Sequence, residues 1–105
     1  TTQVFHIEKD GFDVICDATG IILTDMELLK KIRQWRYEKA KDLKIRPYVI
    51  FNNVTLVDLA TRQPMTREEL LTISGIGEKK VELYGDEIVM IIQRYNQLID
   101  TTNIK

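Results

Sequence analysis

The sequence of 105 residues contains one cysteine, no long apolar run and almost no net charge. Because a single thiol, Cys16, cannot form an internal disulfide and fits a reducing compartment, we expect a cytoplasmic protein. No apolar run is long enough to cross a bilayer, and no charged and then apolar leader is visible, so we expect no membrane partner. The chain starts with Thr1 rather than Met, so we expect a monomeric fragment of a longer protein, folded as one small domain.

Residue patterns typical of catalytic and metal sites are also missing. There is no glycine-rich phosphate loop ending in lysine, so we expect no ATP hydrolysis by this chain. His6 is the single histidine and has no cysteine beside it, which argues against a metal site. The acidic pair Glu68 and Glu69 begins a predicted helix, where the helix dipole already favours negative charge. We therefore expect no catalytic residues, no metal and no cofactor in this chain.

Charge is nearly balanced but unevenly distributed. The 15 Lys and Arg residues against 16 Asp and Glu give a net charge of -1, which excludes a strong electrostatic field for nucleic acid. The first 24 residues are acidic, whereas residues 24–99 carry slightly more Lys and Arg than Asp and Glu. A weakly basic surface is therefore expected on the body of the chain.

Residues 4–17 have the pattern of a β-hairpin. Asp10 and Gly11 favour a two-residue turn, because that turn needs positive φ at both positions. This register places Glu8 opposite Asp13, a small electrostatic penalty. It also gives an apolar face formed by Phe5, Ile7, Phe12, Val14 and Cys16. Residues 18–23 form a third extended piece, so residues 1–23 either dock on the helices or belong to a preceding domain.

A helix is predicted from Thr24 to Leu43, because Thr24 and Glu27 have the spacing of a capping box. The side that should face the core carries Leu28, Leu29, Ile32, Trp35, Ala40 and Leu43. The opposite side, the one with clustered positive charge, carries Lys30, Arg33, Gln34, Tyr37 and Lys41.

Pro47 ends this helix, since proline disfavours helical geometry at the residue before it. We expect Val49, Ile50 and Phe51 in the core. The next helix should begin at Thr55, with Asp58 three residues later, and end before Pro64.

The stretch 70–85 organises the rest of the body. Thr66 and Glu69 form another capping box, opening a short helix. Gly75 suits a left-handed C-terminal cap of this helix. Ile76 is expected to point into the core and fill it, as a plug, and Gly77 allows the next short helix to begin close by. A last helix runs from about residue 86 to residue 98. The prediction is an all-α, five-helix bundle over residues 24–99, preceded by the hairpin and followed by a tail at 100–105.

Several separated motifs resemble the HRDC (helicase and RNase D C-terminal) domain, in particular that of bacterial RecQ-type DNA helicases. The resemblance covers residues 24 to about 99 and rests on residues 48–52, 55–56, 64–66, 71–77, 79–80 and 84–85. It implies a compact helical fold of the SAM-like or helix-hairpin-helix type. It also implies an accessory module of an ATP-dependent 3′-to-5′ helicase, whose own core would use ATP and Mg in DNA repair and recombination at the nucleoid.

The resemblance implies that single-stranded or branched DNA contacts the aromatic residue after the proline and the cations around it. In this sequence these residues are Tyr48, Arg46, Lys44, Arg36, Arg33 and Lys30. An aromatic ring flanked by cations also suits single strands on physical grounds, because bases stack on the ring and cations contact phosphates. This sequence has Arg46 where relatives of the family often have a second proline.

Three alternatives remain open. A turn with glycines at 75 and 77 resembles a helix-hairpin-helix phosphate clamp, with Gly75, Gly77, Lys79 and Lys80 as candidates, although Glu78 opposes an anion there. The domain could instead dock on the helicase core of its own chain or on another protein. The parent could also be a 3′-5′ exoribonuclease of the RNase D type.

Overall fold

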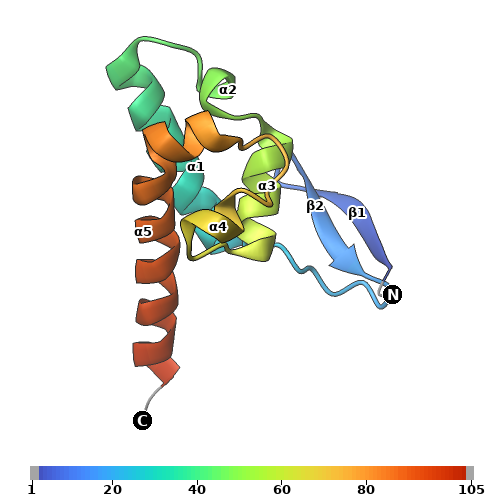
Figure 1. Ribbon diagram of the computed structural model, residues 1–105. Helices are drawn as coiled ribbons and strands as arrows, with labels where there is room; N and C mark the ends of the chain where they lie inside the picture. The colour runs from blue at the N-terminus through green and yellow to red at the C-terminus, as the bar shows by residue number, and fades with distance from the viewer. Residues whose placement is uncertain (1–2, 104–105) are drawn as a thin grey trace.

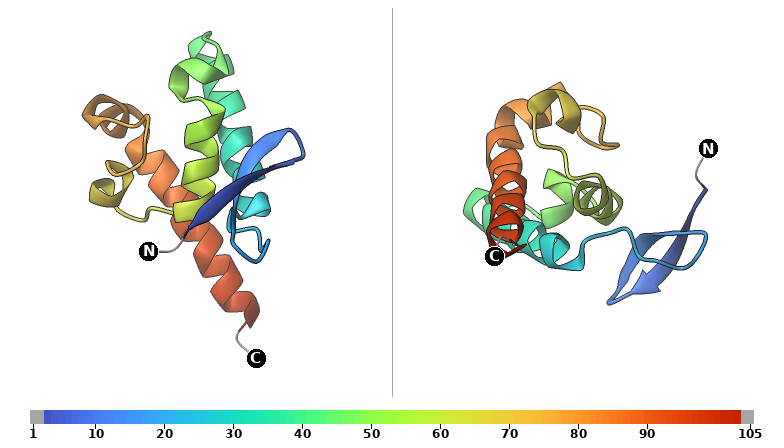
Figure 2. Two further views of the ribbon diagram at one scale, coloured as in Figure 1. Left: turned by 90° about the vertical axis from the view of Figure 1, so that its right-hand side faces the viewer. Right: turned by 90° about the horizontal axis from the view of Figure 1, so that it is seen from below.

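The computed structural model describes residues 3–103, in which five helices follow a two-stranded antiparallel hairpin (Figure 1). The elements are β1 (Val4–Lys9), β2 (Phe12–Asp17), α1 (Met26–Leu43), α2 (Pro47–Ile50), α3 (Asn53–Arg62), α4 (Arg67–Leu70) and α5 (Glu78–Asn103). The hairpin projects from one side of the helical body and α5 forms the other side (Figures 1 and 2). This confirms the mostly helical architecture, although the five helices divide the chain differently from the prediction.

The hairpin has the predicted turn and register. Asp10 and Gly11 have φ values of 53° and 86°, and Glu8 pairs with Asp13. The Glu8 carboxylate accepts a hydrogen bond from the Gly11 N–H at 2.7 Å, which gives this charge a local partner inside the turn. The cost of placing two acids opposite each other is therefore partly offset.

The apolar face of the hairpin is buried on one strand only. Phe12, Val14 and Cys16 of β2 lie in the core, as predicted for that strand. Phe5 and Ile7 pair with Cys16 and Val14, but they remain 48% and 41% exposed because β1 extends beyond the helices. The third extended piece is reduced to a single bridge between Cys16 and Ile22.

Two of the three helix starts predicted at threonines, Thr24 and Thr55, are wrong by one and three residues. Asp25, not Thr24, caps α1 by accepting from the Glu27 and Leu28 N–H groups. Asn52 caps α3 by accepting from the Thr55 N–H at 2.9 Å, so the helix begins before Thr55. The tertiary structure uses both threonine hydroxyls elsewhere, in contacts with residues distant in sequence.

The segment after α1 contains a helix that was not predicted. Pro47 occupies the first turn of α2, where a missing N–H is tolerated. Ile50 and Phe51 are buried as expected, whereas Val49 is 51% exposed and is not a core residue. Because α2 is a helical turn, the Val49 side chain faces solvent while the Ile50 side chain faces the core. The prediction had placed both residues in the core.

The stretch 66–77 is a cap, a short helix and a tight turn, as predicted. The Thr66 hydroxyl accepts from the Glu69 N–H, and the Glu69 carboxylate accepts from the Met65 N–H. Gly75 has a φ of +89°, but it lies in the turn rather than at the helix end, since α4 ends at Leu70. Ile76 is buried, in agreement with its role as a plug.

The predicted break between two helices near residue 85 is wrong, because α5 is continuous from Glu78 to Asn103. Gly85 lies inside the helix, where a Cβ atom would approach Val81 Cγ1 to 3.0 Å and Leu70 Cδ2 to 3.5 Å. Glycine at this position lets α4 pack closely on α5. Its helix propensity, about 1 kcal/mol worse than that of alanine, does not end the helix.

The core lies where α1, α3 and α5 meet. Its largest fully buried apolar side chains are Phe51, Leu28, Leu29, Ile32, Ile50, Leu56, Leu59, Leu70, Ile88 and Ile92. Trp35 stacks on Phe51, with ring centroids 6.3 Å apart, and joins α1 to the start of α3. Across residues 3–103, no helix combines the length and the apolar character needed to span a membrane.

Candidate nucleic-acid interface

The connection between α1 and α2 is built by three local backbone features. Lys44 takes a left-handed conformation with φ 59°, and its N–H donates to the Ala40 and Lys41 carbonyls to end α1. Arg46 is extended at the N-cap position of α2, and Pro47 follows it. The Tyr48 side chain then points outward and is 64% exposed. Lys44 and Arg46 thus lie on the short connection between α1 and α2, and Tyr48 follows them in the first turn of α2.

The two other surface cations of the predicted set lie on α1. Lys30 and Arg33 are both exposed. The Arg33 guanidinium lies 5.5 Å from the centroid of the Phe12 ring, so it rests against the hairpin while its charge remains exposed. Lys30 Nζ is 4.0 Å from Glu27 Oε1, a weak and exposed ion pair.

Arg36 is not a surface residue. It is only 7% exposed, and its guanidinium donates to the Phe51 carbonyl and to Asn53 Oδ1, both at 2.9 Å. It also lies over the Phe51 ring at 5.6 Å from the centroid. Burial lowers the pKa of Arg36, and the nearby charge of Arg33 lowers it further. We therefore correct its assignment: Arg36 ties α1 to the α2–α3 connection and does not reach a nucleic acid.

The four residues of the candidate phosphate clamp lie in the α4–α5 turn and the first turn of α5. Gly77 accepts a hydrogen bond from the Val81 N–H at 3.0 Å, which places it at the start of the helix. Lys79 is exposed and Lys80 half-buried, while Gly75 faces Thr55 of α3. Glu78 occupies the first turn, so negative charge stands where an anion would bind.

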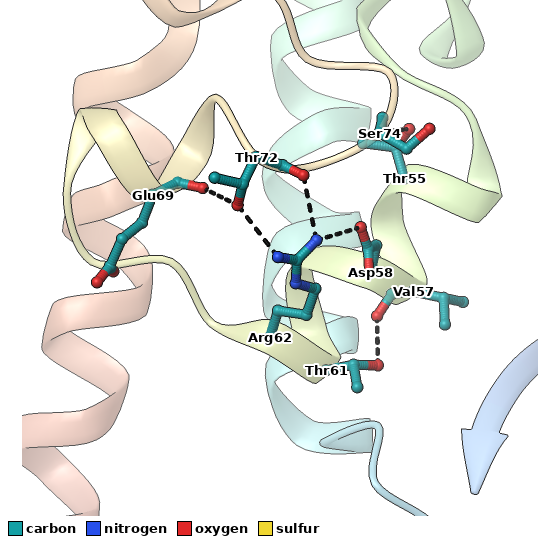
Figure 3. A network of polar contacts seen from close by, with 8 residues as sticks. All are labelled: Thr55, Val57, Asp58, Thr61, Arg62, Glu69, Thr72 and Ser74. Carbon is teal, nitrogen blue, oxygen red and sulfur yellow. Dashed lines mark hydrogen bonds and ion pairs between the residues drawn. The ribbon is translucent and has the colours of Figure 1, made fainter. Parts of the chain in front are cut away.

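A polar network from α3 holds this turn in place (Figure 3). Arg62 donates to the Thr72 carbonyl at 3.1 Å and hydroxyl at 3.3 Å. The Thr55 hydroxyl donates to the Ser74 carbonyl at 2.8 Å. These contacts account for the fixed geometry of the turn without any ligand, which favours a structural role for its glycines.

Among the described residues, no three His, Cys, Asp or Glu side chains are grouped so that they could hold a metal ion. His6 lies 3.5 Å from Asp13, and both side chains are exposed. Cys16 is a buried free thiol of β2.

The prediction of site residues omitted Tyr37. This side chain is 57% exposed and lies on α1 beside the predicted cations. Together with Lys30, Arg33 and Gln34 it lines a shallow depression of about 360 Å³. The signal was present in the sequence, since these four residues recur at spacings of three and four on the polar side of the helix.

Comparison with known proteins agrees with this architecture. The ATP-dependent DNA helicase RecQ of Bacillus subtilis is 36% identical over 74 residues, which cover 70% of this chain and 12% of that protein. The ATP-dependent DNA helicase UvrD2 of Mycobacterium tuberculosis is 35% identical over 69 residues, covering 66% of this chain and 10% of that protein. The chain therefore corresponds to a small part of each of these relatives.

A solved structure is similar as well. The D. radiodurans RecQ HRDC domain 3 has a TM-score of 0.64 and 39% sequence identity, covering 71% of this chain and 95% of that one. The HRDC domain family model matches residues 25–92, which include α1, α2, α3, α4 and most of α5. From these matches and the helical fold they accompany, this chain belongs to the HRDC domain family.

Proposed function

We propose that this HRDC domain binds single-stranded DNA through Tyr48 and the exposed cations around it. The observation that carries the proposal is the 64% exposed Tyr48 ring in the first turn of α2, two residues after Arg46 and just beyond Lys44, which ends α1. A base stacked on such a ring contributes about 1–3 kcal/mol without regard to its identity. The site therefore suits a module that must engage DNA of any sequence.

The affinity should be weak and sensitive to salt. The net charge of -1 provides little long-range attraction. If Lys30, Arg33, Lys44 and Arg46 each neutralise one phosphate, the slope of log K against log salt concentration is about -3 for a single strand. Weak binding suits an accessory module that adds to the affinity of a larger DNA-binding protein.

The parent protein that this proposal implies is an ATP-dependent DNA helicase, with ATP and Mg bound outside this domain. Support comes from the helicases RecQ and UvrD2 among its relatives, each far longer than this chain. In that setting the domain would hold the single strand produced by 3′-to-5′ unwinding during repair or recombination. A ribonuclease D parent would instead present single-stranded RNA to the same surface.

A second candidate function is docking on the helicase core or on another protein. It is favoured by β1, whose apolar residues Val4, Phe5 and Ile7 are 50%, 48% and 41% exposed. Exposed apolar residues grouped on one strand are typical of an interaction surface.

The test is binding of a fluorescent oligothymidylate, measured by anisotropy at low and moderate salt. We expect Tyr48→Ala to weaken binding about tenfold or more, whereas Tyr48→Phe, which keeps the ring, retains it. Arg46→Ala should weaken binding and reduce the salt slope by about 0.7. The matched control is Arg67→Ala, because Arg67 lies on α4 and pairs with Asp86 at 2.9 Å.

Unchanged binding by a folded Tyr48→Ala variant would overturn the proposal. Absence of DNA binding at low salt, together with binding to the isolated helicase core, would establish the docking function instead.

A further inference from the structure

The outward face of α1 carries a continuous row of polar and aromatic side chains. Residues 30, 33, 34, 37, 41 and 44 recur at spacings of three and four, which places them along one side of the helix. All six are exposed. Four of them are Lys or Arg, and Tyr37 lies in the middle of the row. We refer to these six residues as the α1 stripe.

Tyr37 differs from the two tyrosines that make tertiary contacts, Tyr84 and Tyr95. The chain has four tyrosines. The Tyr95 hydroxyl donates to the Asp25 carboxylate at 2.7 and 2.8 Å, and the Tyr84 ring meets Trp35 edge-on at 5.9 Å. In contrast, the Tyr37 hydroxyl has no hydrogen-bond partner among residues 3–99, whose side chains the structure describes, and the Tyr37 side chain is 57% exposed. Among the described tyrosines, Tyr37 shares this exposure only with Tyr48.

The surroundings of Tyr37 suit a nucleotide. Lys30, Arg33 and Gln34 complete the shallow depression of about 360 Å³ beside the ring, so two cations and an amide surround an aromatic face. Two acids of α1 have partners on the stripe: Glu38 accepts from Gln34 at 2.8 Å, and Glu27 lies 4.0 Å from Lys30 in a weak ion pair. Base stacking on an aromatic ring, with cations for the backbone phosphates, is the common chemistry of single-strand binding.

We infer that Tyr37 is a second base-stacking site and that a single strand lies along the α1 stripe, from Lys30 to the Tyr48 end of the helix. The inference rests on the proposed function, because Tyr48 supplies the other stacking site. The 14 steps from Lys30 to Lys44 span about 21 Å of helix axis at about 1.5 Å per residue. At roughly 3.4 Å per phosphate, the spacing of a fully stacked strand, this length holds at most about six nucleotides.

This arrangement predicts how affinity depends on the length of the oligonucleotide. A trinucleotide is too short to cover the stripe, and we expect it to bind at Tyr48, where Lys44 and Arg46 lie nearby. A decanucleotide reaches both Tyr37 and Tyr48. Tyr37→Ala should therefore weaken the decathymidylate about tenfold and the trithymidylate by less than twofold. Tyr48→Ala should weaken both.

The experiment is anisotropy with the two oligothymidylates on the folded domain, with thermal unfolding followed by circular dichroism for each variant. Tyr37→Phe should bind as the unaltered protein does, since stacking uses the ring and not the hydroxyl. Tyr37→Ala should leave the salt slope unchanged, whereas Lys41→Ala should reduce it by about 0.7. The matched control is Leu83→Ala, which removes a side chain of α5 with a similar exposure of 55%.

The outcomes separate the inference from the proposed function. Decathymidylate binding that falls with Tyr48→Ala but not with Tyr37→Ala would overturn the inference and keep the proposed function. Equal losses with Tyr37→Ala and Tyr37→Phe would also overturn it, because the ring would then not be the contact. If the unaltered protein binds neither oligonucleotide at low salt, the proposed function fails and the inference fails with it.

Discussion

Gly75 offers the sharpest test of how the α4–α5 turn is held. Its φ is +89°, and a Cβ atom there would collide with the Thr55 hydroxyl oxygen. That hydroxyl donates to the Ser74 carbonyl at 2.8 Å and belongs to a side chain that is only 2% exposed. Gly75→Ala therefore combines backbone strain with the displacement of a hydrogen bond.

The expected loss of stability is the sum of these two effects. A side chain in the left-handed region costs about 1–2 kcal/mol. Displacing the Thr55 hydroxyl costs roughly 2–3 kcal/mol more, through the lost hydrogen bond and local overpacking. Gly75→Ala should thus reduce the free energy of unfolding by about 3–5 kcal/mol, which for a domain of this size lowers the Tm by more than about 10 °C.

A double-mutant cycle separates the collision from the strain. In a Thr55→Ala background the nearest remaining Thr55 atom to the added methyl is the Cβ, at 3.6 Å, so only the cost of the positive φ should remain. Gly75→Ala should then cost about 1–2 kcal/mol. In a Thr55→Val background a methyl group replaces the hydroxyl, so the collision and most of the cost should persist. Urea unfolding measures all three, and equal costs in the three backgrounds would refute the reasoning.

Three ionisable side chains, Arg36, Tyr95 and Glu87, each lead to a further prediction. Arg36→Ala should lower the free energy of unfolding by about 2–4 kcal/mol, because it leaves the Phe51 carbonyl without its donor, whereas Arg33→Ala should change it by less than about 0.5 kcal/mol in the same urea assay. Burial raises the pKa of Tyr95 from 10.0 to about 12, and the hydrogen bond to Asp25 is the second cause. The stability that the neutral Tyr95 contributes is therefore complete below pH 10 and is lost as the pH rises towards 12. An ultraviolet titration should show one late tyrosine that disappears in Tyr95→Phe; a normal titration of all tyrosines would contradict the contact. The hydrogen bond from Lys39 lowers the pKa of Glu87 from 4.5, so the contribution of this pair to stability is present above pH 4.5 and is lost as the pH falls below it. Glu87→Gln should remove this acid sensitivity and lower the free energy of unfolding by about 0.5 kcal/mol near pH 7. If the stability of the variant depended on acid pH as that of the unaltered protein does, the pair would be contradicted.

Local patterns predicted the elements whose hydrogen bonds lie within a few residues. The turn at Asp10 and Gly11 and the cap at Thr66 form as expected, because the partners of each are three residues or fewer away. Tyr48 was expected at the surface and is exposed there. Its contact with DNA is still a prediction.

Arg36 was placed among the DNA contacts because the family resemblance implied it, and such a contact needs a charge that extends into water. Its neighbours one turn away, Ile32 and Ala40, are both buried, so Arg36 lies within the apolar side of α1. The charge is retained there because Phe51 and Asn53 supply acceptors from another part of the chain. No pattern inside α1 could reveal those acceptors.

The sequence by itself determined the family, the hairpin followed by helices, and the placement of aromatic and positive side chains on the polar side of α1, because these depend on short spacings along the chain. Tertiary structure decided among competing local options. The Thr24 hydroxyl bonds to the Ile15 N–H and to Thr61 and does not cap α1, and Gly85 lies inside α5, where Leu70 packs close to it. In each case a partner distant in sequence outweighs a local preference worth about 1 kcal/mol.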